Sequence, residues 1–172
     1  MPPAGLPVLV CGDPRRCDDG VALRAAAGLP RAARALADVR PVGQLDPQAL
    51  LDAARPCIVV DAVVGVPAGT LVDMALGEVA QVGAPAPHSS HALPAAMVVG
   101  LAEAMGADLD GSRLIGVGIG DVRFGTELSP PVAAALPRLI EMLAVAIAEL
   151  SSRPLVAGSA ATADRSLATV PA

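Results

Sequence analysis

Two aspartates and one histidine, far apart along the chain, stand where strands are expected to end or helices to begin. Asp19 comes shortly after an apolar run and a glycine, and Asp61 interrupts a second apolar run. His91 precedes a stretch of small and apolar residues. Carboxylate and imidazole groups form a ligand set that suits divalent nickel or zinc and leaves positions open for water or substrate. A cation held there polarises a carbonyl and activates water, which is hydrolytic chemistry.

Each of these residues also has a purely structural interpretation. The adjacent Asp18 and Asp19 can both cap a helix near the positive end of its dipole. Asp61 can accept hydrogen bonds from loop amides, and His91 can be a cap or a surface residue. A charge inside so apolar a run is costly unless it is paired, coordinated or placed at the solvent-facing end, so Asp61 requires a specific environment.

The elements that must position these residues alternate between strands and helices. Strands are expected over 6–11, 57–64 and 113–120, weakly near 39–43, and once or twice within 70–81. Helices are expected after Asp18 or Asp19 as far as Pro30, from Asp46 to about Ala54, after Ser89 or Ser90 with Pro94 in the first turn, and after Ser129.

This alternation predicts a three-layer α/β/α domain, with a mostly parallel twisted sheet flanked by helices on both faces. Ligands bind such sheets at the carboxyl ends of the strands, so Asp19, Asp61 and His91 are expected to converge there. Residues 1–150 are interpreted as one domain. Residues 151–172 are small, polar and unpatterned, and are interpreted as a disordered C-terminal tail.

Composition excludes several classes of function. The net charge is −5, Lys is absent and Phe124 is the sole aromatic residue, which disfavours nucleic-acid binding. Without Lys there is no P-loop, and without a GxSxG elbow serine hydrolysis is disfavoured. The glycines of 116–120 lack the spacing of a dinucleotide loop. No apolar run free of charges and Pro is long enough to span a membrane.

The three cysteines favour a reducing cytoplasm. Cys11, Cys17 and Cys57 form neither a CxxC pair nor an even disulfide set, and the N-terminus lacks a basic signal-peptide start. The spacing from Cys11 to Cys17 is unusual for structural zinc, so buried thiols are the preferred interpretation.

Four blocks, in order and with matching spacing, resemble the hydrogenase maturation endopeptidases, from about Leu6 to Leu150. The blocks are Gly12-Asp13-Pro14 with Asp18-Asp19-Gly20, Val59-Val60-Asp61-Ala62-Val63, Ser89-Ser90-His91-Ala92-Leu93, and Gly125-Thr126-Glu127-Leu128-Ser129-Pro130 with Val132. Asp13 replaces the family's usual Asn. The segment 118–121 also departs from the family, which often has proline or bulkier residues there.

The resemblance implies that Asp19, Asp61 and His91 are the catalytic and metal-contacting residues, with Asp18 securing the turn and the helix start. His88 is the rival histidine, but it lacks the preceding Ser-x. The implied function is nickel-dependent removal of the C-terminal peptide from the precursor of the nickel-iron hydrogenase large subunit, in the cytoplasm. The nickel would arrive with this substrate. The alternative is a non-catalytic metal-sensing or chaperone protein of the same fold that binds the large subunit.

Overall fold

Five strands form one sheet in the order β2-β1-β3-β5-β4 in the computed structural model, which describes residues 5–53, 56–81 and 94–153. The strands are β1 (Leu6–Cys11), β2 (Ala37–Gly43), β3 (Ile58–Val63), β4 (Leu71–Ala75) and β5 (Arg113–Gly118). Neighbouring strands are parallel, except that the edge strand β4 is antiparallel to β5. The predicted mostly parallel sheet is confirmed.

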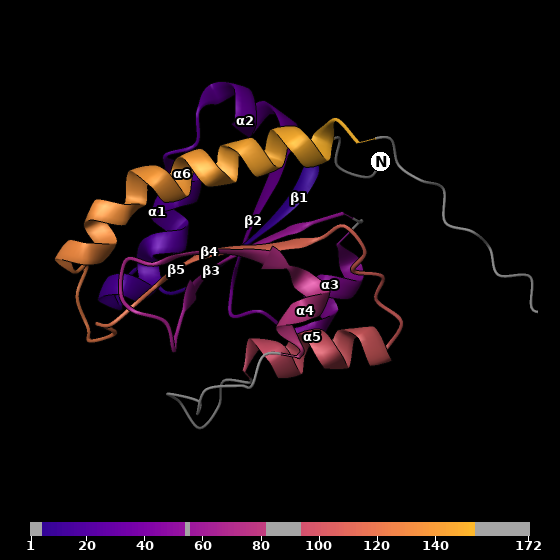
Figure 1. The fold of residues 1–172 in the computed structure, drawn as a ribbon, viewed down its shortest axis with the longest axis horizontal. Coiled ribbons are helices and arrows are strands. Elements are labelled where there is room, and N and C mark those ends of the chain that lie inside the picture. Colours follow the sequence, from indigo (N-terminus) through magenta and orange to yellow (C-terminus); the bar gives the residue numbers. More distant parts are fainter. Residues whose placement is uncertain (1–4, 54–55, 82–93, 154–172) are drawn as a thin grey trace, which may run out of the picture.

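Helices cover both faces of this sheet (Figure 1). The described helices are the 3-10 turn η1 (Cys17–Gly20), α1 (Val21–Ala27), α2 (Arg31–Leu36), α3 (Pro47–Asp52), α4 (Leu76–Val79), α5 (Ala95–Ala104) and α6 (Pro130–Ser151). Figure 1 shows α1, α2 and α6 on one side of the sheet and α3, α4 and α5 on the other. The predicted three-layer α/β/α architecture is therefore confirmed.

The strands are apolar throughout because both of their faces are covered. Every residue of β1 is buried, and its side chains alternate between two cores. Val8 and Val10 belong to the core shared with α1 and α6, whereas Leu9 and Cys11 belong to the core shared with α3 and α5. Burial on both faces explains why this run shows no alternation of apolar and polar residues.

The order of the strands creates a crevice next to β1. The chain leaves β1, forms α1 and α2 on one face, and returns as β2. It then crosses the other face through α3 and returns as β3 on the opposite side of β1. Loops that leave a sheet in opposite directions diverge at the carboxyl ends of the strands, and ligands bind at such points. The segments that follow β1 and β3 therefore border an open region.

Some boundaries differ from those expected from the sequence. The helix at Asp46 is confirmed, because Asp46 Oδ1 accepts a hydrogen bond from the Ala49 N–H at 2.8 Å, although α3 ends at Asp52. The region 70–81 contains one strand followed by α4, not two strands. Leu76 and Val79 are spaced by three residues and both are buried against the core that contains α5, so helical spacing decides this segment.

The helix that follows the 82–93 region starts at Ala95, later than expected. Pro94 occupies the N-cap position with extended backbone angles, so the prediction that Pro94 lies inside the first turn is wrong. Ser89 and Ser90, the expected caps, lie outside the described residues. The same holds for residues 154–172, which make up most of the predicted disordered tail.

The last helix, α6, is long and apolar enough to cross a membrane by length and composition. It lies across the sheet beside α1 and α2 (Figure 1). Its buried stripe forms part of the core, with Leu139, Leu143 and Ile147 fully covered. Core helices meet the same length and composition criterion, so one such helix is weak support for a membrane span.

Candidate active site

A cleft of about 690 Å³ opens at the carboxyl ends of β1 and β3, where the strand order predicts a ligand site. It is lined by Cys11, Gly12, Asp13, Pro14, Arg15, Arg16, Asp19, Gly43, Gln44, Leu45, Asp61, Ala62, Val64, Ala95, Ile119 and Val122. Asp19 and Asp61 both belong to this lining. The structure therefore brings together two of the three residues selected from the sequence.

Asp19 reaches the cleft from the 3-10 turn η1, which follows β1 after a short loop. Its Oδ2 atom accepts a hydrogen bond from the Asp13 N–H at 2.8 Å, which orients the carboxylate. Gly12 makes this arrangement possible because its φ is +107° and a Cβ atom there would lie 2.0 Å from the carbonyl oxygen of Asp19. The glycine and the turn are thus packed too closely for any side chain at position 12.

Asp61 reaches the same cleft from β3, where the strand emerges from the core. The residues before it, Ile58 to Val60, are fully buried, whereas Asp61 is partly exposed. Its Oδ1 atom accepts a hydrogen bond from the Ala62 N–H at 2.8 Å. Burial raises the pKa of Asp61 to about 7; the Ala62 N–H opposes this rise, and the negative charge of Asp19 adds to it. Asp61 can therefore hold a proton near neutral pH.

The third predicted ligand, His91, lies outside the described residues, and so does its rival His88. Within 5–53, 56–81 and 94–153, no group of three His, Cys, Asp or Glu side chains is arranged to hold a metal ion. Of the three predicted ligands, the described part of the site thus supplies the two carboxylates, Asp19 and Asp61.

Asp18, the neighbour of Asp19, has a role that the sequence analysis assigned wrongly. It does not cap α1, whose N-cap is Gly20, and Asp19 does not cap it either. Asp18 is fully buried, and its carboxylate accepts hydrogen bonds from Ser129 N at 2.7 Å, Ser129 Oγ at 2.8 Å, Asp121 N at 3.0 Å and Gly120 N at 3.2 Å.

The helix start that Asp18 secures is therefore that of α6, whose N-cap is Ser129. Burial by itself would raise the pKa of Asp18, but the donors from Asp121, Ser129 and Gly120 outweigh it and lower that pKa below its ordinary value. This role of Asp18 cannot be predicted from the spacing of residues along the chain, because the hydrogen-bond donors to Asp18 lie more than 100 residues away.

Asp13, which stands where the family usually has Asn, does not add an uncompensated charge to the cleft. Its Oδ2 atom forms an ion pair with Arg15 at 2.9 Å, and its Oδ1 atom accepts hydrogen bonds from Arg15 N and Nε. The bonds and charge of Arg15 lower the pKa of Asp13 to about 2. The substitution is thus accommodated locally by Arg15.

The prediction that the three cysteines are buried thiols is confirmed, and all three are free. Burial raises the pKa of Cys11, and the nearby charges of Asp61 and Asp19 raise it further. Burial also raises the pKa of Cys57. The Cys11 and Cys57 thiols are therefore poor nucleophiles at neutral pH. The glycine-rich stretch at 116–120 lies mostly inside β5, which agrees with its exclusion as a dinucleotide loop.

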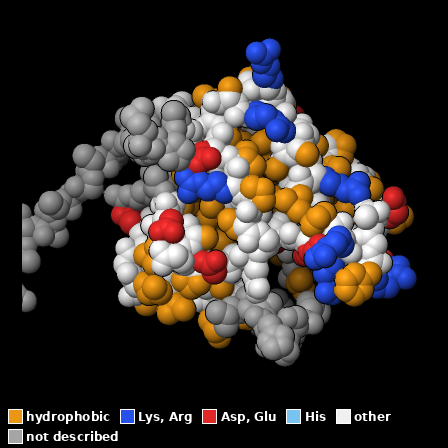
Figure 2. All heavy atoms as spheres, turned by 180° about the vertical axis from the view of Figure 1, so that it is seen from behind, with side chains coloured by type: hydrophobic (Ala, Val, Ile, Leu, Met, Phe, Trp, Pro, Cys, Tyr) orange, Lys and Arg blue, Asp and Glu red, His pale blue; other side chains and the backbone are white. Residues whose placement is uncertain are grey.

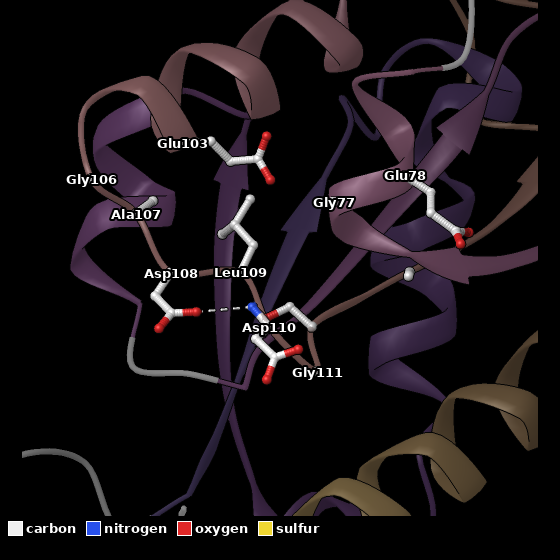
Figure 3. Close-up of a pocket in the computed structure, with 11 residues that line it drawn as sticks. Gly77, Glu78, Glu103, Gly106, Ala107, Asp108, Leu109, Asp110 and Gly111 are labelled. Carbon is white, nitrogen blue, oxygen red and sulfur yellow. Dashed lines mark hydrogen bonds between the residues drawn. The ribbon is translucent and has the colours of Figure 1, made fainter. Parts of the chain in front are cut away.

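A second cleft, of about 510 Å³, lies at the amino end of β5, away from Asp19 and Asp61 (Figure 3). It carries four carboxylates, from Glu78, Glu103, Asp108 and Asp110. Figure 3 shows these carboxylates spread around the cleft without pointing at a common centre. The four carboxylates therefore do not converge on a single ligand position, and the cleft that holds Asp19 and Asp61 is the better candidate for the active site.

Comparison with known proteins agrees with this architecture. A sequence model of the hydrogenase maturation protease family matches residues 46–146, which include Asp61 and His91. The hydrogenase maturating endopeptidase HybD from E. coli has the same fold, with a TM-score of 0.64 and 20% identity over 84% of this chain and 93% of that chain. No curated protein sequence matches this chain significantly.

A second solved structure, the [NiFe] hydrogenase maturation protease HycI from Thermococcus kodakarensis, has a TM-score of 0.58 and 17% identity over 84% of this chain and 93% of that chain. These similarities in fold extend beyond the segment matched by the family model, which does not include Asp19. Because the family model spans more than half of the chain, the protein belongs to the hydrogenase maturation protease family and is a maturation endopeptidase.

Proposed function

We propose that this endopeptidase removes the C-terminal peptide of the precursor of the nickel-iron hydrogenase large subunit, and that nickel already bound in the precursor is required. The observation that carries the proposal is the cleft that Asp19 and Asp61 both line. Its volume of about 690 Å³ lies within the roughly 300–1,000 Å³ of ligand pockets. A segment of a polypeptide can therefore enter it.

The two carboxylates have the chemistry that a nickel-containing substrate requires. Asp19 uses Oδ2 for the Asp13 N–H and Asp61 uses Oδ1 for the Ala62 N–H. Among the described residues, the second oxygen of Asp19 is thus left to contact a cation, and that of Asp61 is left to contact the cation or to accept a proton. Oxygen donors together with an imidazole suit divalent nickel. Ala95 at the start of α5 lines the cleft, and His91 precedes it by four residues in the sequence, which supports His91 as the third contact.

Within the cleft we assign different tasks to the two aspartates. Asp19 is oriented by a backbone N–H and contacts the substrate's nickel as an anion. Asp61, with its pKa raised to about 7 by burial, is the better matched group to accept a proton from the attacking water. Nickel carried by the substrate and held by these residues would polarise the scissile carbonyl. Because the three cysteines are free thiols, we propose that the reaction takes place in the reducing cytoplasm.

The decisive experiment compares nickel-loaded and nickel-free precursor in separate incubations with the protein. Intact mass spectrometry of the products is expected to show loss of a C-terminal peptide from the nickel-loaded precursor only. Cleavage of both precursors would contradict the proposed requirement for nickel. Two intact precursors would remove the protease function in favour of a non-catalytic metal-sensing or chaperone protein.

A second experiment tests the individual side chains. Asp19→Asn, Asp61→Asn and His91→Ala are each expected to abolish processing while far-UV circular dichroism stays unchanged. The matched control is His88→Ala, which is expected to process the precursor at the rate of the unmodified protein. Normal processing by His91→Ala together with no processing by His88→Ala would transfer the ligand role to His88.

A further inference from the structure

Phe124, the one Phe, Tyr or Trp in this sequence, is 85% exposed. It lies in the loop between β5 and α6, next to Arg123, which is also exposed. A large apolar side chain that is mostly exposed to water gains little from burial in the core, and aromatic residues are enriched where proteins bind partners. The position of this ring therefore calls for an explanation in terms of a contact.

The loop that carries Phe124 is held firmly against the segment that follows β1. Cys17 N donates to Gly125 O at 2.8 Å, and Gly125 N donates to Arg15 O at 2.9 Å. The Arg16 guanidinium lies over the Phe124 ring, 5.5 Å from its centroid. These contacts hold the exposed ring in one place, which lowers the entropic cost of binding to it.

The ring stands beside the cleft that contains Asp19 and Asp61. Arg15, Arg16 and Val122 line that cleft, and Val122 is two residues from Phe124. We call residues 15–16 and 122–124 the Arg16–Phe124 lip. Figure 2 shows basic side chains beside hydrophobic atoms at the right-hand edge of the molecule. Because this view is turned by 180°, the same end lies at the left of Figure 1, where α1 and the loop before α6 are found.

The charges on the lip are not equivalent. Arg15 is paired with Asp13, and Arg123 is paired with Asp121 at 2.7 Å. Arg16 instead packs on Phe124 while it lines the cleft. Its guanidinium can therefore donate to a carbonyl or carboxylate oxygen of a bound chain while the ring contacts an apolar side chain. Aromatic and arginine side chains of this kind contribute most of the free energy in many protein interfaces.

We propose that the Arg16–Phe124 lip is the docking point for the protein substrate of this endopeptidase, and that it binds an apolar side chain of the segment that enters the cleft. The inference rests on the proposed function. A protein substrate is favoured over a second copy of this chain because the lip is continuous with the cleft, so a contact between two copies there would obstruct the site.

The test is Phe124→Ala, which removes an exposed ring and leaves the core intact. The nickel-loaded precursor of the hydrogenase large subunit is the probe, with KM and kcat measured for processing and Kd by biolayer interferometry. We expect KM and Kd to rise about tenfold and kcat to stay within about twofold. The matched control is Val145→Ala, another exposed apolar side chain, on α6, which is expected to change none of these values. Phe124→Leu is expected to restore part of the affinity.

The outcomes separate this inference from the proposed function. If the unmodified protein processes the precursor and Phe124→Ala has unchanged KM and Kd, the lip is not a docking point, although the protease function stands. If the precursor binds without being cleaved and Phe124→Ala weakens binding, the lip stands and the protease function fails. Absence of binding by the unmodified protein overturns both. If Phe124→Ala changes the sedimentation coefficient of the protein but leaves its Kd for the precursor unchanged, the lip is a contact between copies of this chain and the inference is overturned.

Discussion

Replacement of Asp18 by alanine is expected to destabilise the protein far more than an ordinary substitution in a turn. The carboxylate is fully buried and accepts hydrogen bonds from Gly120 N, Asp121 N, Ser129 N and Ser129 Oγ. The methyl group of alanine can accept none of these bonds. Three backbone N–H groups and one hydroxyl then lose their partner at the junction of η1, the loop after β5 and the start of α6.

The size of this effect follows from the number of donors. A buried donor that loses its partner costs about 1–3 kcal/mol, and more when the partner was charged. Allowing for relaxation and entry of water, the loss for Asp18→Ala is about 4–6 kcal/mol, a large share of the roughly 5–15 kcal/mol by which domains are stable. Asp18→Asn keeps one acceptor oxygen but turns an amide N–H₂ toward a donor, for a loss of about 2–3 kcal/mol.

Urea unfolding followed by circular dichroism measures these differences, with Asp46→Ala as the matched control. Asp46 accepts one bond, from Ala49 N at the exposed start of α3, so its loss costs about 1 kcal/mol. If the loss of unfolding free energy for Asp18→Ala lies within about 1 kcal/mol of the loss for Asp46→Ala, the four hydrogen bonds of Asp18 do not stabilise the fold as argued.

The pH dependence of Asp18 has a definite sign. Its donors outweigh burial and lower its pKa below the ordinary value of 3.8 in the folded protein. The stability it contributes is therefore complete well above pH 3.8 and is lost as the pH falls through the lower folded value. The difference in unfolding free energy between the unmodified protein and Asp18→Asn is expected to shrink in strong acid.

Three further predictions concern the surroundings of the site. Gly12→Ala is expected to lower the free energy of unfolding by more than about 3 kcal/mol, measured in urea, and to abolish processing, because its Cβ would collide with the Asp19 carbonyl. The control is Gly43→Ala, which also has a positive φ but has nothing within 4 Å of the added Cβ, and it is expected to lower the free energy of unfolding by about 1 kcal/mol. The pKa of Asp61 is raised from 3.8 to about 7, so between these pH values the folded protein binds a proton that the unfolded chain does not, and stability falls as the pH rises. This fall is at most about 3 kcal/mol between pH 5 and 7, and Asp61→Asn is expected to remove it. Unfolding curves at the two pH values measure the difference. The three buried cysteines are expected to react with a thiol reagent at least about tenfold more slowly in the native protein than in urea, and equal rates would contradict their burial.

Local signals along the chain were sufficient for much of the fold. The continuous apolar run Leu6–Cys11 is a strand buried on both faces, and Asp46 followed by Pro47 is an N-cap with a first-turn proline. Segments with mixed signals were harder. The region 70–81 is predicted to hold one or two short strands; it holds one, and Leu76–Val79 form a helix because Leu76 and Val79 are buried at helical spacing against α5.

Local patterning is enough to predict the alternation of strands and helices, and it places Asp19 just after one buried strand and Asp61 near the end of another, which brings both to one cleft. The role of Asp18 and the position of the Phe124 ring beside the cleft depend instead on how the folded chain brings distant residues together. Long-range contacts set these features. A carboxylate can be satisfied by any donors that folding brings to it, and the identity of those donors, more than 100 residues away for Asp18, is not encoded in the residues next to it.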